Sequence, residues 1–132
     1  MVEVSAGIII SDSNILCFQK GGAKYPYLSN KWEFPGGKVE NGEDPKDTLI
    51  RELSEELCID LQSNTLTHLC DTQYSYPDFD VLLHSYIINV DKIEFTLTEH
   101  ISYKWCTVKD LKNLDWAEAD KDIVKRLEEY YG

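Results

Sequence analysis

The sequence is poor in positive charge and has no long apolar segment. Thirteen Lys and Arg residues stand against 24 Asp and Glu residues, so the formal net charge of the 132-residue chain is −11. Such an acidic chain repels polyanions, which argues against a DNA- or RNA-binding protein. No apolar run approaches the length of a membrane-spanning helix, and no basic segment followed by a long apolar one opens the chain. We therefore expect neither a membrane protein nor a signal peptide.

The chain also lacks paired cysteines. Its four Cys residues are scattered, and no Cys-x-x-Cys pair occurs. This spacing argues against a zinc site or a disulfide framework and favours reduced, mostly buried thiols in a cytoplasmic protein. The sequence has no repeat, low-complexity segment or linker. Because the length suits one domain with a substantial core, we expect residues 1–132 to form a single domain.

Residues 32–59 contain a glycine pair followed by a strongly amphipathic helix. Asp44 and Pro45 mark the helix start, with Asp44 as N-cap and Pro45 at the first helical position. Leucines then recur every four residues and give the helix a buried face. They are Leu49, Leu53 and Leu57.

Three glutamates share another face of this helix, because Glu52, Glu55 and Glu56 stand at i, i+3 and i+4. Like charges repel one another unless a cation lies among them. Oxygen ligands without Cys or His suit a hard cation such as Mg²⁺ or Mn²⁺. A solvated acidic face is the alternative interpretation. The preceding Gly36 and Gly37 allow a ligand to approach the backbone closely, which favours a ligand site.

Periodicity and turn signals predict the other elements. Strands are expected over residues 2–10, 15–19, 32–34, 65–76, 81–90, 92–97 and 103–106. One helical turn is expected over residues 108–111 and a last helix over 120–131, with Ile123, Val124, Leu127 and Tyr130 or Tyr131 on its buried side. Residues 21–31 are expected to form a loop beside a substrate entrance. The order of elements indicates an α/β or α+β fold with a mixed sheet between helices.

The glycine pair and the charged helix together resemble the signature of the Nudix hydrolase family. The matching positions are Gly37, Glu43, Arg51, Glu52, Glu55 and Glu56. The resemblance covers nearly the whole chain and implies the Nudix fold, in which a mixed β-sheet is sandwiched between helices. Cys58 is one departure, because the family usually has Gly there to end the helix in a left-handed turn. A Cys residue in that turn would be strained by on the order of 1 kcal/mol, so the sequence leaves the form of this turn open while the carboxylates still match.

The resemblance implies metal-assisted hydrolysis of a nucleoside triphosphate to the monophosphate and pyrophosphate, by attack of water on phosphorus. The implied ligands of Mg²⁺, or of Mn²⁺, are the carbonyl of Gly36 and the carboxylates of Glu52, Glu55, Glu56 and Glu99. Either Glu52 or Glu99 is the implied general base, and we favour Glu52. Arg51 is expected to tether Glu43 rather than touch the substrate, because it lies off the carboxylate face.

Similarity to MutT-like members of the family implies a set of substrate contacts at Lys20, Phe34, Gly37, Lys38 and Asp120. The two lysines would contact phosphates and Phe34 would stack on the base. The alternatives are a surface charge for Lys20 and a helix cap for Asp120. The turn at residues 77–80 carries Phe79 where some MutT-like members have a substrate-binding Arg, so that contact is not expected here.

The stretch from Glu99 onward is similar to the CTP pyrophosphohydrolase branch of these enzymes. This similarity implies that Asp120 contacts the edge of the base. Members that act on 8-oxo-dGTP have Asn at the same position. An ionised Asp only accepts hydrogen bonds and suits an exocyclic amino group such as that of cytosine, whereas a protonated Asp could donate.

We therefore expect a small nucleotide as the partner, and a CTP- or dCTP-like or modified cytosine substrate. The alternatives are a diphosphatase that removes 8-oxo-dGTP from the nucleotide pool and a non-catalytic nucleotide-binding module. The chain is expected to be a monomer or a homodimer. The three histidines are interpreted as structural or surface residues, with His100 nearest the site.

Overall fold

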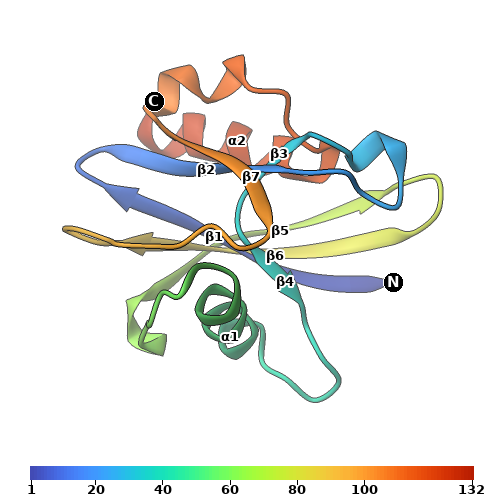
Figure 1. Cartoon of the computed structure of the whole chain (residues 1–132), viewed down its shortest axis with the longest axis horizontal. Helices are drawn as coiled ribbons and strands as arrows, with labels where there is room; N and C mark the ends of the chain where they lie inside the picture. Colours follow the sequence, from blue (N-terminus) through green and yellow to red (C-terminus); the bar gives the residue numbers. More distant parts are fainter.

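The computed structural model describes residues 1–132 as a mixed sheet between two α-helices (Figure 1). The strands are β1 (Val2–Ser11), β2 (Asn14–Lys20), β3 (Trp32–Glu33), β4 (Gly36–Lys38), β5 (Leu66–Ser75), β6 (Asp80–Asn89) and β7 (His100–Cys106). The α-helices are α1 (Pro45–Leu57) and α2 (Glu118–Tyr131), and the 3-10 helices are η1 (Pro26–Leu28), η2 (Ser63–Thr65) and η3 (Val108–Asn113). No helix is both long and apolar enough to span a membrane.

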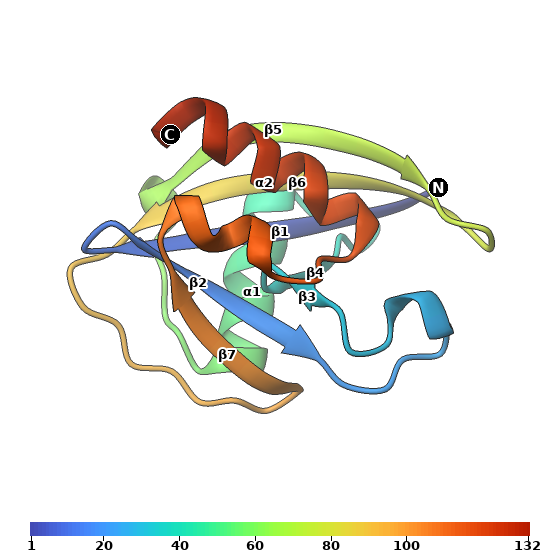
Figure 2. The same ribbon diagram turned by 90° about the horizontal axis from the view of Figure 1, so that it is seen from above.

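The sheet is mixed because β1 and β6 pair in parallel, whereas the other paired strands are antiparallel. The strand order is β3–β2–β1–β6–β5, with β4 also paired to β1 and β7 to β2. Figure 1 shows α1 on one side of the sheet and α2 on the other, and Figure 2 shows α2 lying across the sheet in the view from above. The predicted α/β sandwich is therefore confirmed.

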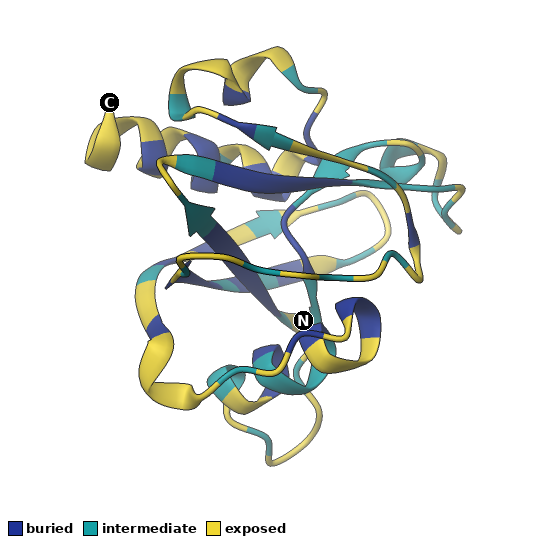
Figure 3. Cartoon of the chain, turned by 60° about the vertical axis from the view of Figure 1, so that its left-hand side comes forward, coloured by how far each residue is buried: buried dark blue, intermediate teal, exposed yellow.

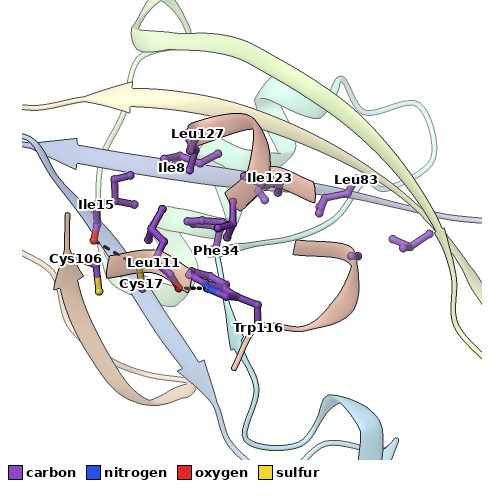
Figure 4. Packing of buried hydrophobic residues seen from close by; sticks show 14 residues of the cluster. Ile8, Ile15, Cys17, Phe34, Leu83, Cys106, Leu111, Trp116, Ile123 and Leu127 are labelled. Atoms are coloured by element: carbon purple, nitrogen blue, oxygen red, sulfur yellow. Dashed lines mark hydrogen bonds between the residues drawn. The ribbon is translucent and has the colours of Figure 1, made fainter. Parts of the chain in front are cut away.

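Strand β1 is buried on both faces, as its apolar run predicts. Ile8 and Ile9 point to opposite sides of the sheet, and both are fully buried. Ile8 belongs to the apolar cluster beneath α2, which Figure 4 shows, and Ile9 to the cluster that also contains Leu53 of α1. Figure 3 shows the same arrangement, with buried residues along the strands and on the inward faces of both helices.

Helix α1 begins as the sequence predicts, and it ends in the left-handed turn that the sequence left open. The Asp44 side chain accepts a hydrogen bond from the Lys46 N–H at 2.9 Å, and Pro45 opens the helix. Cys58 ends it in the left-handed region, at φ 58° and ψ 33°, and its N–H bonds to carbonyls of the last turn. Cys58 is exposed and the other three cysteines are buried, and all four are free thiols.

Two predictions near the C-terminal helix are wrong. Helix α2 begins at Glu118 rather than at Asp120, and Ala117 is its N-cap. Tyr130 and Tyr131 are 70% and 44% exposed rather than buried. The last buried residue of α2 is Leu127, so the final turn carries no core contact and its aromatic rings face solvent.

The strand predicted over residues 92–97 is also absent. Ile93, Phe95 and Leu97 alternate as predicted and pack against the core beside α1. Their backbone does not join the sheet, however, and the N–H of Thr96 instead donates to the carbonyl of Leu57 at 2.9 Å. The alternation of apolar and polar residues therefore indicates that one side of the segment is buried. It does not indicate that the segment pairs with another strand.

Candidate functional site

The glycine pair lies where β4 pairs with the start of β1, with Gly36 opposite Ala6 and Gly37 opposite Ser5. A Cβ atom on Gly36 would collide with the backbone carbonyl of Ser5, and one on Gly37 would collide with the carboxylate of Glu52. Close approach of two backbones therefore requires glycine at position 36, whereas a side chain at position 37 would displace the Glu52 carboxylate. This approach brings the backbone of β4 next to the carboxylate face of α1.

Arg51 ties the loop before α1 to the helix. Its guanidinium donates to both carboxylate oxygens of Glu43, each at 3.0 Å, and this contact, helped by Thr48, lowers the pKa of Glu43 to about 2. The predicted tether is confirmed. Arg51 also contacts Glu52 at 2.9 Å and Glu55 at 3.4 Å, so the prediction that it lies off the carboxylate face is wrong.

Glu56 is the buried member of the carboxylate cluster. Its side chain is on the inner side of α1, the residue is 7% exposed, and its Oε2 atom has no hydrogen-bond partner. Burial, followed by repulsion from Glu99, Glu52 and Glu33, raises the pKa of Glu56 to about 9. A buried carboxylate that has one unpartnered oxygen and lies among other acids is what a divalent cation would neutralise.

The remaining predicted ligands surround Glu56 at different depths. Glu52 is held by Arg51, and the Glu55 side chain is 60% exposed and reaches the same guanidinium. As the side chains lie, no three His, Cys, Asp or Glu residues are close enough to enclose a metal ion. The oxygen-only donor set, the unpartnered Oε2 atom of Glu56 and the Oε2 atom of Glu52 fit a hard cation, because Arg51 bonds only to the other oxygen of Glu52.

Glu99 reaches this cluster because the preceding irregular segment is fixed to the end of α1. The Thr98 hydroxyl donates to the Glu56 carbonyl, and the Thr96 N–H donates to the Leu57 carbonyl. These bonds satisfy carbonyls that the last turn of a helix leaves free. The sequence interpretation missed this role of the two threonines, because it assigned part of the segment to a strand.

A cleft of about 270 Å³ lies beside the glycine pair and gathers every predicted substrate-binding residue. Its lining includes Lys20, Phe34, Gly36, Gly37, Lys38 and Asp120. A neighbouring cavity of about 340 Å³ shares Lys20 and Lys38 and adds Lys24. The largest cavity, about 620 Å³, surrounds Ile10 and Val90 at the other end of β1 and contains none of the predicted residues.

Asp120 is buried at the inner end of this cleft. Its Oδ2 atom accepts a hydrogen bond from the N–H of Phe34 at 3.0 Å. Burial, followed by the charge of Glu33, raises the pKa of Asp120 well above its ordinary range. The alternative that Asp120 only caps α2 is wrong, because it lies inside the first turn and its side chain bonds instead to the N–H of Phe34, between β3 and β4.

Phe34 belongs to the core, although it lines the cleft. Its ring stacks on Trp116 with centroids 4.6 Å apart and an interplanar angle of 25°, and the residue is only 4% exposed (Figure 4). The predicted stacking of Phe34 on a base is therefore not supported, because Trp116 covers a ring face and little of the side chain is accessible. Its N–H contributes instead, by fixing Asp120.

Glu33 is a cleft residue that the sequence interpretation missed. It lines the cleft, and its Oε2 atom lies 3.0 Å from Nε2 of the buried His100, whose Nδ1 has no partner. His100, the histidine predicted to lie nearest the site, thus contacts a residue that lines the cleft. In the sequence, Glu33 is marked only by its position between two aromatic residues in a short strand. Its contact with His100 could not be predicted, because His100 lies on β7, far away in the sequence.

The NUDIX domain family matches residues 1–127. The 8-oxo-dGTP diphosphatase of Escherichia coli (strain K12) is 29% identical over 126 residues, which are 96% of this chain and 95% of that protein. The CTP pyrophosphohydrolase of the same organism is 34% identical over 130 residues, covering 95% of this chain and 90% of that protein. The solution structure of the E. coli ORF135 protein matches with a TM-score of 0.83 and 29% identity, over 98% of this chain and 89% of that one.

Proposed function

Since the chain belongs to the NUDIX family, we propose that it hydrolyses a cytosine nucleoside triphosphate to the monophosphate and pyrophosphate. Its family and relatives make it a Nudix nucleotide pyrophosphohydrolase. The proposal for the substrate is carried by Asp120, a buried carboxyl group in the cleft that also holds the glycine pair and two lysines. Residues 1–132 act as a single domain in this proposal.

Nudix hydrolases generally depend on a divalent metal ion. In this proposal the ion is Mg²⁺, with Mn²⁺ as a substitute. The residues that would hold it are Gly36, through its carbonyl, and Glu52, Glu55, Glu56 and Glu99. A bound divalent ion neutralises phosphate charge and makes water more acidic. The support is the unpartnered buried carboxylate of Glu56 and the oxygen-only donor set around it.

The chain's own residues then position the reactants. Lys20 and Lys38 attract the phosphate groups, and the backbone of Gly36 and Gly37 lets those groups come close. Glu52 takes the proton from the attacking water, because Arg51 orients its carboxylate beside the glycine pair. Glu99 is the alternative base. This division of work suits phosphoryl chemistry, which relies on positioning and charge neutralisation.

Asp120 reads the base. One of its oxygens is occupied by the N–H of Phe34, and the other makes no hydrogen bond within the protein. An ionised carboxylate in this place accepts a hydrogen bond from an exocyclic amino group, which cytosine presents. The 34% identity to a CTP pyrophosphohydrolase supports the same substrate class.

A second candidate substrate is 8-oxo-dGTP. Burial raises the pKa of Asp120, and a protonated carboxyl group offers one donor and one acceptor, as an Asn amide does. That pattern suits an oxidised purine, whose edge presents an N–H beside a carbonyl group. A 29% identical relative is an 8-oxo-dGTP diphosphatase. Only turnover measurements separate the two candidates.

The experiment is an assay of pyrophosphate release with Mg²⁺ on CTP, dCTP, 5-methyl-dCTP and 8-oxo-dGTP. We expect the highest kcat/KM for a cytosine nucleotide and loss of most of this activity in Glu56→Gln, with Glu129→Gln on the exposed side of α2 as the matched control. A preference for 8-oxo-dGTP would refute the cytosine proposal. No release from any nucleotide would instead favour a binding module without catalysis.

A further inference from the structure

Helix α2 begins without a capping side chain of its own. Its N-cap residue is Ala117, which has no side-chain acceptor. The first N–H groups of a helix have no partner within the helix and need an acceptor from elsewhere. The N–H of Ala119 finds one in the Tyr76 hydroxyl oxygen, at 2.9 Å. Tyr76, which lies 43 positions before Ala119 in the sequence, therefore caps the first turn of α2 next to Asp120.

The Tyr76 side chain is held rigidly enough to serve as a cap. Tyr76 follows β5 at the start of the turn to β6, and its own N–H donates to the Phe79 carbonyl at 2.8 Å. Three aromatic rings surround its ring, with centroid distances of 4.7, 5.2 and 5.3 Å. They belong to Tyr74, Phe79 and Tyr27 respectively. The hydroxyl oxygen is thus placed by packing and not only by its hydrogen bond.

This packing extends to the loop over the neighbouring cavity. The Tyr27 hydroxyl donates to Oδ2 of Asp78 at 2.9 Å, and the rings of Tyr25 and Phe79 lie 5.5 Å apart. Residues 21–31 and the β5–β6 turn are therefore joined next to the cleft. Tyr76 connects this pair of segments to the first turn of α2.

We propose that Tyr76 is a positioning residue for substrate choice: by capping α2 it fixes the direction in which Asp120 presents its carboxyl group to the base. The proposal rests on the proposed function of Asp120. Asp120 is the residue directly after Ala119, so a shift of the capped turn moves its carboxyl group as well. A fixed carboxyl group discriminates between base edges, whereas one that moves accepts several.

The test is Tyr76→Phe, which keeps the ring and removes the acceptor. We expect the ratio of kcat/KM between the best base and the next best in the nucleotide panel to fall about fivefold, as loss of a helix cap predicts. The loss should appear in KM for the best nucleotide, with kcat largely kept, because the phosphate-binding residues are untouched. Tyr74→Phe is the matched control, because its hydroxyl makes no hydrogen bond and the ratio should not change.

Two further measurements separate positioning from a general loss of structure. Amide hydrogen exchange of Ala119, followed by NMR, should become faster in Tyr76→Phe and not in Tyr74→Phe. Combined with Asp120→Ala, which removes the contact with the base, the Tyr76→Phe substitution should add no further loss of discrimination, because both act on the same contact. Additive losses in the double variant, or an unchanged ratio in Tyr76→Phe, would overturn the proposal.

The failure of this inference can be told apart from failure of the proposed function. If Asp120→Asn changes the base preference and Tyr76→Phe does not, Tyr76 has no positioning role and Asp120 keeps its proposed one. If Asp120→Asn leaves the preference unchanged, the proposed contact between Asp120 and the base is wrong, and the inference is overturned with it.

Discussion

In the proposed function, the protonation state of the Asp120 carboxyl group decides which base edge it can meet. It is buried, it lies in the same cleft as Glu33, and it receives one hydrogen bond, from the N–H of Phe34. Burial raises the pKa of Asp120, so the group binds its proton at pH values where an ordinary Asp is ionised. The substrate preference of the protein should therefore depend on pH.

We expect the ratio of 8-oxo-dGTP to CTP turnover to fall as the pH rises. Below its raised pKa, Asp120 carries a proton and can donate, which an oxidised purine requires; above that pKa it is ionised and only accepts. The measurement is kcat/KM for both nucleotides between pH 6 and 9. Asp120→Asn, which does not titrate, should give a ratio that does not change with pH. A ratio equally flat in both proteins would exclude Asp120 as the titrating group.

The sequence predicts which side chains of α1 share a face but not how deeply each is buried. The spacing of Glu52, Glu55 and Glu56 follows from helical periodicity alone. Glu56 is buried and Glu55 exposed because of the rotation of α1 against the sheet, which depends on the whole core. For the same reason the stacking of Phe34 on Trp116 could not be read from the sequence.

At the level of elements, the end of α1 contains a residue in an unfavourable backbone conformation. Cys58 has φ 58°, where a Cβ atom costs on the order of 1 kcal/mol. We expect Cys58→Gly to stabilise the protein by about that amount in chemical denaturation. Cys58→Ala, which keeps the Cβ atom, should not. Destabilisation by Cys58→Gly would mean that the exposed thiol makes contacts worth more than the strain.

The side chain of His84, on β6, contacts residues of both β1 and β5. Its Nδ1 lies 2.9 Å from Oδ1 of Asp71, and its Nε2 lies 3.1 Å from Oε1 of Glu3. Burial alone would lower the pKa of His84, but the bonds to these two carboxylates outweigh it and raise the pKa above 6.5. The charged imidazole is therefore favoured in the folded state.

The contribution of His84 to stability should be fully present below about pH 6.5 and should disappear as the pH rises through its raised pKa. We expect His84→Gln to destabilise the protein by about 1 kcal/mol at pH 6 and by less at pH 8.5, a modest value because the partners are half exposed. Urea unfolding at both pH values measures this difference. A larger loss at pH 8.5 than at pH 6 would reverse the assigned sign.

Most elements were predictable because their sequence patterns are local. The strands around residues 2–10 and 81–90 follow from apolar runs, and α1 follows from its cap and its leucines. The segment over residues 92–97 has the pattern of a strand but no neighbouring strand to pair with, which only the tertiary structure decides. The cap of α2 comes from Tyr76, 43 positions away, so its start was predicted two residues late.

For the molecule as a whole, a net charge of −11 must be reconciled with an anionic substrate. Lys20, Lys24 and Lys38 line one cavity next to the cleft, and no acidic residue lines that cavity. We infer that this local positive charge attracts the phosphate groups against the overall repulsion. Its effect should be strongest where salt does not screen it.

We expect Lys38→Gln to raise KM for the preferred triphosphate about tenfold at low ionic strength, with a smaller increase at high ionic strength. The Debye length falls from about 30 Å at 0.01 M salt to about 3 Å at 1 M, so the contribution of the charge is reduced. The measurement is KM over that range, and Lys109→Gln at an exposed position on η3 is the control. Equal KM values for Lys38→Gln and the unmodified protein would remove Lys38 from the site.

We propose that the carboxylates around Glu56 hold a divalent ion beside the cleft. Titration of Mn²⁺ followed by electron paramagnetic resonance tests it most directly, in the unmodified protein, in Glu56→Gln and in Glu129→Gln. We expect Glu56→Gln to weaken Mn²⁺ binding at least about tenfold, since even the loss of a ligand's hydrogen-bond partner can do so. Glu129→Gln should bind as the unmodified protein does. Equal Mn²⁺ affinity in all three proteins would contradict the account.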